Sequence, residues 1–166
     1  MDIQLRKRND WIKLQGAMNE TLGPLKIYIV EDSPIIRRLL ASASEAAHAE
    51  IVGSSADAQT AIKELSHINP DLILIDLVLE SGTGFDVMKA LREQSLAPTA
   101  IKIVLTNYGN AEFEESSFRL GADFFFEKST ELSQVLLLIS HMAAERGIPP
   151  RRSVLDHRNG ENGNDR

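Results

Sequence analysis

A short apolar segment with one acid inside it, LILIDLVLE, constrains the fold of this chain more than any other feature. Four apolar residues precede Asp76, more follow it, and turn-forming residues bound the segment on both sides. Such a run is typical of a strand buried on both faces, as in a parallel sheet covered by helices. Because an unpaired buried charge is unfavourable, we expect Asp76 at the carboxyl end of the strand, where open α/β sheets keep their ligand crevice.

The neighbouring segments alternate between strand and helix patterns. Strands are predicted at residues 25–30, 50–55, 72–76, 100–106 and 122–127. Helices are predicted to begin at Pro34 and to cover residues 58–65, 85–94, 110–120 and 132–145, with Ser33 and Asp57 as N-caps. This alternation indicates an α/β domain, a parallel sheet with right-handed crossovers and helices on both faces.

Two details of burial follow from the same patterns. The helix that begins at Pro34 is expected to bury a stripe made of Ile35, Ile36, Leu39, Leu40 and Ala43. In the last strand, side chains alternate between the two faces of the sheet. One of the three consecutive residues Phe124, Phe125 and Phe126 is therefore expected on the opposite face from the other two.

The two ends of the chain differ from the domain at residues 25–146. The arm, residues 1–24, carries Trp11, Leu14 and Met18 on one helical face, interleaved with basic residues. Two interpretations stay open: a frayed arm with a turn or two of helix, or a helical arm that docks its Trp11 face on the domain or on a partner. The tail, residues 147–166, is rich in Pro, Gly, Asn and Arg and is predicted to be disordered.

The composition excludes few classes of protein but favours some over others. A net charge of −6 weakly disfavours nucleic-acid binding. The chain has no cysteine, so disulfides and thiolate chemistry are absent. The basic N-terminus is not followed by an apolar segment, and no apolar run approaches the roughly 20 residues that span a membrane. We therefore expect a cytoplasmic protein without a membrane partner.

Polar side chains gather where the predicted strands end. They are Glu31 and Asp32 after the first strand, Asp76 in the third, Thr106 in the fourth and Lys128 after the fifth. Each of them except Asp76 is, taken alone, also typical of a solvated turn, but the carboxyl ends of parallel strands meet at one edge, so together they predict one crevice. Close carboxylates repel one another, and a hard cation such as Mg²⁺ relieves that repulsion. Because neither His nor Cys stands at these strand ends, zinc and copper are disfavoured.

The same set of groups suits phosphoryl transfer. A metal ion, an ammonium group and a hydroxyl group together neutralise the oxygens of a transferring phosphoryl group, and a carboxylate can serve as its nucleophile. At these positions the sequence resembles the receiver domain of two-component response regulators, over roughly residues 25–145. The resemblance rests on the acids in IVEDSP, the acid in LILIDL, Thr106 in IVLTN, Lys128 in FFFEKS and the spacing between them.

This resemblance implies a fold and a role for each site residue. The fold would be a flavodoxin-like, doubly wound (βα)5 domain with strand order 2-1-3-4-5. Asp76 would accept a phosphoryl group from a phosphohistidine, and Lys128 and Thr106 would contact that group. Glu31, Asp32, Asp76 and the backbone carbonyl of Val78 would hold Mg²⁺. Thr106 and Phe125 would form a two-state switch that phosphorylation biases.

The resemblance also implies partners. The phosphoryl donor would be a sensor histidine kinase or a phosphotransfer protein. No output domain is recognised after the last predicted helix, so we expect a stand-alone receiver, or a piece of a longer regulator, without a folded nucleic-acid-binding module. Output would then go through protein contact, at the face made by the helix at 110–120, the last strand and the last helix. A homodimer is left open.

Other functions are compatible with parts of this pattern. Hydrolases of the haloacid-dehalogenase type also place a nucleophilic Asp after an apolar strand, but they need a second acid two residues later, where this chain has Val78. A flavodoxin-like cofactor binder needs a phosphate loop after the first strand, and the acidic EDSP would repel a phosphate. A receiver-like interaction module that is not phosphorylated stays open as an alternative. We expect a regulatory phosphoacceptor that catalyses only its own phosphorylation and dephosphorylation, and not an enzyme.

Overall fold

The computed structural model describes residues 23–146, which contain one parallel sheet of five strands. The strands are β1 (Lys26–Val30), β2 (Glu50–Ser55), β3 (Leu72–Ile75), β4 (Ile101–Thr106) and β5 (Phe124–Glu127). Their order in the sheet is β2-β1-β3-β4-β5, and every neighbouring pair is parallel. The predicted α/β fold and strand order are thereby confirmed.

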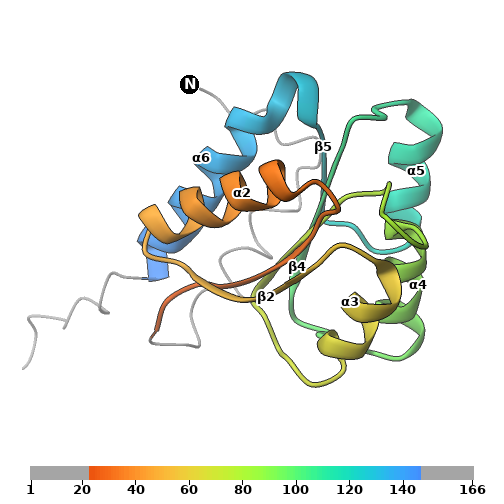
Figure 1. The fold of residues 1–166 in the computed structure, drawn as a ribbon, viewed down its shortest axis with the longest axis horizontal. Helices are drawn as coiled ribbons and strands as arrows, with labels where there is room; N and C mark the ends of the chain where they lie inside the picture. Colours follow the sequence, from red (N-terminus) through yellow and green to blue (C-terminus); the bar gives the residue numbers. More distant parts are fainter. Residues whose placement is uncertain (1–22, 147–166) are drawn as a thin grey trace, which may run out of the picture.

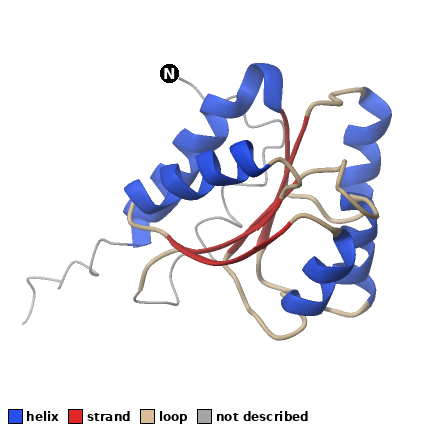
Figure 2. Ribbon diagram, in the orientation of Figure 1, coloured by secondary structure: helices blue, strands red, loops and turns tan. Residues whose placement is uncertain are grey.

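Helices cover both faces of this sheet (Figures 1 and 2). They are α2 (Pro34–Ala46), α3 (Ala58–Leu65), α4 (Gly84–Glu93), α5 (Ala111–Arg119) and α6 (Lys128–Arg146). One face lies under α2 and α6, and the other lies under α3, α4 and α5. None of the helices in this range is long and apolar enough to cross a membrane. The predictions for the arm and the tail fall on residues 1–22 and 147–166, outside the described residues.

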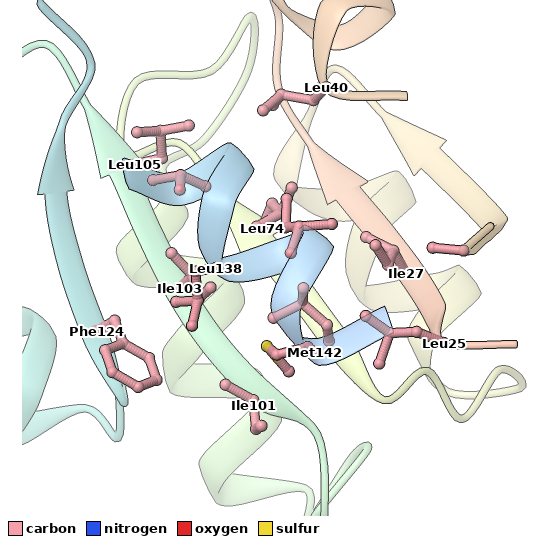
Figure 3. Packing of buried hydrophobic residues seen from close by; sticks show 14 of the residues in the cluster. Leu25, Ile27, Leu40, Leu74, Ile101, Ile103, Leu105, Phe124, Leu138 and Met142 are labelled. Atoms are coloured by element: carbon pink, nitrogen blue, oxygen red, sulfur yellow. The ribbon is translucent and has the colours of Figure 1, made fainter. Parts of the chain in front are cut away.

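Each face of the sheet has its own hydrophobic core. Figure 3 shows the core under α6, where Leu138 and Met142 pack toward Ile27, Leu74 and Ile103 of three neighbouring strands. Phe124 and Phe126 belong to this core, with their rings stacked 6.3 Å apart, whereas Phe125 belongs to the core under α3, α4 and α5. The alternation predicted for the three phenylalanines is confirmed.

Local sequence signals account for the helix boundaries. Ser33 Oγ accepts a hydrogen bond from the backbone N–H of Ile36, and Pro34 opens α2, as predicted. Asp57 caps α3 in the same way, through the N–H of Thr60. Thr83 caps α4 in a reciprocal capping box with Asp86, a cap that is not among those predicted from the sequence.

The last helix begins earlier than its apolar period predicts. The prediction starts at residue 132, but α6 starts at Lys128, directly after β5. The carboxylate of Glu131 accepts a hydrogen bond from the N–H of Glu127 at 2.9 Å and thereby stabilises this first turn. Lys128 is therefore held by a helix and not by a loop.

The predicted buried stripe of α2 is partly wrong. Leu40 is buried and Ile36 is partly buried against the core, but Ile35 is 78% exposed and Leu39 is 42% exposed. The side of α2 that faces the sheet carries Ser44 one turn after Leu40, so it lies away from Ile35 and Leu39. The buried side of α2 is therefore centred on Leu40 and Ser44, and Ile35 and Leu39 lie on the side that faces solvent.

Candidate functional site

The sheet topology brings the polar strand ends to one edge. Glu31 follows β1, Asp76 follows β3, Thr106 ends β4 and Lys128 follows β5. These four strands are consecutive neighbours in the sheet. The side chains of these residues are all buried, and the adjacent Asp32 is partly buried. Residues that are far apart in the sequence therefore share one crevice at the carboxyl edge.

Lys128 joins two of the acids. Its ammonium Nζ lies 2.5 Å from Asp76 Oδ2 and 2.6 Å from Glu31 Oε2. The side chains of all three residues are at most 6% exposed. A buried charge is unfavourable without a partner of opposite sign, and here the ammonium group is paired with the two carboxylates. The pair of contacts places Lys128 at the centre of the site.

The acids also lie close to one another. Carboxylate oxygens of Glu31, Asp32 and Asp76 all lie within 4.8 Å of one another. An all-oxygen set of this kind suits a hard divalent cation and does not suit zinc or copper. The described residues at this edge therefore fit a metal ion such as Mg²⁺ by the chemistry of their donors.

Burial and the neighbouring charges shift two pKa values in the site. Burial raises the pKa of Glu31 above its ordinary value, and the contacts with Lys128 oppose that rise. Burial by itself would lower the pKa of Lys128, but the hydrogen bonds to Asp76 and Glu31 and the negative charges of these acids together outweigh burial, so that pKa is raised. Lys128 therefore stays an ammonium ion at neutral pH and partly compensates the clustered carboxylates.

The loop after β3 wraps closely around Asp76. The N–H of Val78 donates a hydrogen bond to Asp76 Oδ1 at 3.2 Å. The N–H of Gly84 donates to the carbonyl oxygen of Leu77 at 3.0 Å, which closes the loop. A Cβ atom at Gly84 would overlap the carbonyl oxygen of Asp76, so only glycine fits this close approach. The side chain of Val78 is 46% exposed beside the site.

Thr106 and Phe125 are both buried. Thr106 is fully buried, and its hydroxyl oxygen accepts a long hydrogen bond of 3.4 Å from the N–H of Tyr108. Phe125 is 6% exposed and packs in the core under α3, α4 and α5. Phe125 on β5 is paired with Val104 on β4, and Val104 lies two residues before Thr106.

One positively charged residue at this edge was not foreseen from the sequence. Arg37, in the first turns of α2, donates a hydrogen bond from Nη1 to the carbonyl oxygen of Glu31 at 2.6 Å. The N–H of Ser33 donates to Glu31 Oε1 at 3.1 Å. These contacts fix the backbone and the side chain of Glu31. The only signal in the sequence was a basic residue one helical turn beyond the N-cap.

The comparison with protein families decides the identity. Residues 27–140 match the family model described as the response regulator receiver domain. The chain belongs to this family. Receiver domains of this kind serve in two-component regulatory systems, and the crevice built by β1, β3, β4 and β5 lies within the matched residues.

The relatives include a regulatory protein and enzymes that match this chain over part of their length. The acid tolerance regulatory protein ActR of Rhizobium meliloti is 33% identical over 142 residues, which cover 84% of this chain and 71% of ActR. A protein-glutamate methylesterase/protein-glutamine glutaminase of Myxococcus xanthus is 27% identical to this receiver domain, in a match that covers 68% of the chain. The chain spans only 26% to 38% of the length of three relatives with that enzyme name.

Solved structures show the same fold. The crystal structure of the phosphorylated cyanobacterial phytochrome response regulator RcpA is 26% identical to this receiver domain, with a TM-score of 0.62. The match covers 72% of this chain and 91% of RcpA. The five-stranded domain is therefore shared with a response regulator whose structure was determined in a phosphorylated form.

Proposed function

We propose that this receiver domain accepts a phosphoryl group on Asp76 from a phosphohistidine of a sensor histidine kinase or a phosphotransfer protein. The observation that carries this proposal is the ion pair of 2.5 Å between Asp76 Oδ2 and Lys128 Nζ, next to two further acids. A carboxylate oxygen of Asp76 would attack phosphorus while the bond from phosphorus to the histidine nitrogen breaks. The product would be an acyl phosphate on Asp76.

Residues of this chain would hold the phosphoryl group during transfer. Lys128 would exchange part of its contact with Asp76 for one with the phosphoryl oxygens, without leaving the crevice. The hydroxyl of Thr106 would donate a hydrogen bond to the same group. The N–H of Val78, which donates to Asp76 Oδ1 at 3.2 Å, would add a hydrogen bond to a phosphoryl oxygen.

Glu31, Asp32 and Asp76, with the backbone carbonyl of Val78, would hold Mg²⁺ in this crevice. The donor set supports this assignment, because the three carboxylates lie within 4.8 Å of one another and offer only oxygen ligands. When bound there, Mg²⁺ would supply positive charge to phosphoryl oxygens. The ammonium group of Lys128 supplies one positive charge against three carboxylates, which leaves a net negative crevice for a cation.

We further propose that phosphorylation shifts the domain between two states. Thr106 would move toward the phosphoryl group and Phe125 would rotate into the space it leaves. The burial of both residues on neighbouring strands supports this proposal. The changed surface would be the face of α5, β5 and α6, which would bind a downstream protein.

Phosphorylation of the purified chain tests the acceptor. Acetyl phosphate with Mg²⁺ should add the mass of one phosphoryl group, and Asp76→Asn should abolish that addition. Glu80→Gln, which changes an exposed acid of the same loop, is the matched control and should label like the original chain. An unlabelled original chain at saturating acetyl phosphate would refute phosphoacceptor function. Undiminished labelling of Asp76→Asn would place the acceptor elsewhere.

Stability measurements test the metal site separately. A ligand that binds only the folded state at ten times its Kd raises the free energy of unfolding by about 1.4 kcal/mol. Mg²⁺ should produce an increase of this kind in urea denaturation, and EDTA should reverse it. Asp32→Asn should weaken the effect, whereas Glu80→Gln should not. An unfolding curve of the original chain that is unchanged by Mg²⁺ would argue against the site.

A further inference from the structure

An apolar groove lies between the C-terminal ends of α2 and α6, with a volume of about 560 Å³. Figure 1 shows the two helices side by side on one face of the sheet. Because each helix runs antiparallel to the strand that precedes it, these ends lie at the edge of the sheet opposite to Asp76. Five small side chains form most of the lining: Ala43, Ala46, Ala47, Ala143 and Ala144. Alanine side chains end at Cβ, so neither helix fills the space between them.

His48, which follows α2 and lines the groove, has a backbone conformation that is usually adopted by glycine. His48 adopts a φ of 62°, the left-handed region in which glycine is preferred at helix ends. Its N–H donates to the carbonyl oxygen of Glu45, and the N–H of Ala49 donates to that of Ser44, which ends the helix. His48 lines the groove together with Ser140 of α6. The lining of the groove thus combines five alanines with two polar residues.

The chain enters the domain beside this groove. The carbonyl oxygen of Leu25 accepts a hydrogen bond of 2.8 Å from the N–H of Glu50, two residues after His48. Leu25 is 1% exposed and belongs to the same hydrophobic core as Met142 and Ala143. Residues 1–22 therefore join the domain at the edge where the groove opens, and a helix of a dozen residues has a length of about 18 Å.

The arm matches the groove in polarity and charge. Its Trp11, Leu14 and Met18 repeat at the spacing of one helical face and offer large apolar side chains for an alanine-lined space. The exposed acids nearest the groove in the sequence are Glu45, Glu50 and Glu145. The arm carries the basic residues Arg6, Lys7, Arg8 and Lys13. The tail begins at the same end of α6, but its sequence contains the consecutive prolines Pro149 and Pro150, a pattern that disfavours a helix with one apolar face.

We propose that the arm docks as a helix in the groove between α2 and α6 of its own chain, with Trp11 against the alanines. The arm would then act as an additional layer over the amino-end edge of the receiver domain. This site is separate from the crevice of Asp76, and the proposal that the arm docks there does not rest on the proposed phosphorylation.

Tryptophan fluorescence tests the docking directly, because the chain has a single tryptophan, Trp11. In the full chain the emission of Trp11 should be blue-shifted, and its quenching by acrylamide several-fold weaker, relative to a free peptide of residues 1–22. Ala144→Arg on α6 and Ala46→Arg on α2 change exposed positions of the two walls of the groove. Each should return the emission and the quenching toward the values of the peptide.

A matched control and a dilution series separate this site from other occupants. Ser133→Arg changes an exposed position on α6 away from the groove and should leave Trp11 protected. Urea denaturation of each variant confirms that the domain is folded. Peptide-like emission in the original chain would overturn the proposal, and so would equal effects of Ala144→Arg and Ser133→Arg. Protection that disappears on dilution, together with dissociation of a dimer, would place the arm in a second copy and overturn docking within one chain.

Discussion

The ring of Tyr28 on β1 lies across Gly53 on β2, its partner in the strand register. A Cβ atom at Gly53 would come within 2.6 Å of Cε2 of the ring. Beyond the glycine, the hydroxyl of Tyr28 donates a hydrogen bond of 2.6 Å to Glu64 Oε2 on α3. The absence of a side chain at Gly53 therefore lets one fully buried aromatic residue link β1, the edge strand β2 and α3.

Gly53→Ala should destabilise the domain. An added methyl group in a well-packed site typically lowers the free energy of unfolding by about 1–3 kcal/mol, which exceeds the backbone benefit of replacing glycine in a strand. Urea denaturation measures the change. In a Tyr28→Leu background the same substitution should be much less harmful, because leucine does not reach over Gly53. Equal losses in both backgrounds would contradict the ring contact.

Tyr28 should make the stability of the domain sensitive to alkaline pH. Burial, followed by the hydrogen bond to Glu64, raises the pKa of Tyr28. In the unfolded chain a tyrosine ionises near pH 10, so above about pH 10 the unfolded state binds fewer protons than the folded state. The free energy of unfolding should therefore fall as the pH rises beyond that value, and the contribution of Tyr28 should be constant below it.

Denaturation at about pH 8 and about pH 11 measures this dependence, since the two values bracket the ordinary tyrosine pKa. Tyr28→Phe should lose part of the alkaline decrease, although it is less stable by about 1–2 kcal/mol at the lower pH because a hydrogen bond is missing. Tyr108→Phe changes a tyrosine that is 55% exposed and should behave like the original chain. An identical alkaline decrease in all three proteins would rule out a role for Tyr28.

Gly84→Ala should disturb the loop that carries Asp76. The new Cβ atom would overlap the carbonyl oxygen of Asp76 and lie 2.9 Å from Cα of Leu77, and neither backbone atom can rotate away. We expect a loss of about 3 kcal/mol in the free energy of unfolding and slower labelling by acetyl phosphate. Ser81→Ala, at an exposed position of the same loop, should change neither quantity. Normal stability of Gly84→Ala would show that the loop can relax.

Ser95→Gly should stabilise the domain. Ser95 follows α4 with a φ of 51°, in the left-handed region, and the N–H of Leu96 donates to the carbonyl oxygen of Leu91 as the helix ends. Glycine adopts this conformation without strain, so we expect an increase of about 0.5–1 kcal/mol in the free energy of unfolding. Ser95→Ala keeps a Cβ atom and should give no increase. A loss of stability in Ser95→Gly would contradict the strain.

Much of the fold could be read from local patterns. The predicted strand at residues 50–55 has the observed bounds, and the helix predicted to begin at Pro34 begins there. Both predictions succeed because periodicity and caps act over a few neighbouring residues. The start of α6 at Lys128 was missed, since its first turn depends on the side chain of Glu131 and not on an apolar period. The exposure of Ile35 was missed, because apolar character does not say which part of a helix faces the sheet.

The candidate site was predictable in its members but not in its contacts. The placement of Glu31, Asp76 and Lys128 at strand ends followed from the rule that parallel strands end at one edge. That Lys128 lies within 2.6 Å of both acids depends on the reach of three side chains from three elements, which no period in the sequence encodes. The support of Glu31 by Arg37 has the same origin.

The amino-acid sequence by itself determined the alternation of strands and helices and the parallel direction of the strands. It also determined which residues stand at the carboxyl edge of the sheet. These features depend on local periodicity and on chain topology. Only the tertiary structure decided which charges touch, which residue of a helix faces water and that Tyr28 passes over Gly53 to reach Glu64. Such contacts join elements that are distant in the chain, and their distances are set by how all the layers pack together.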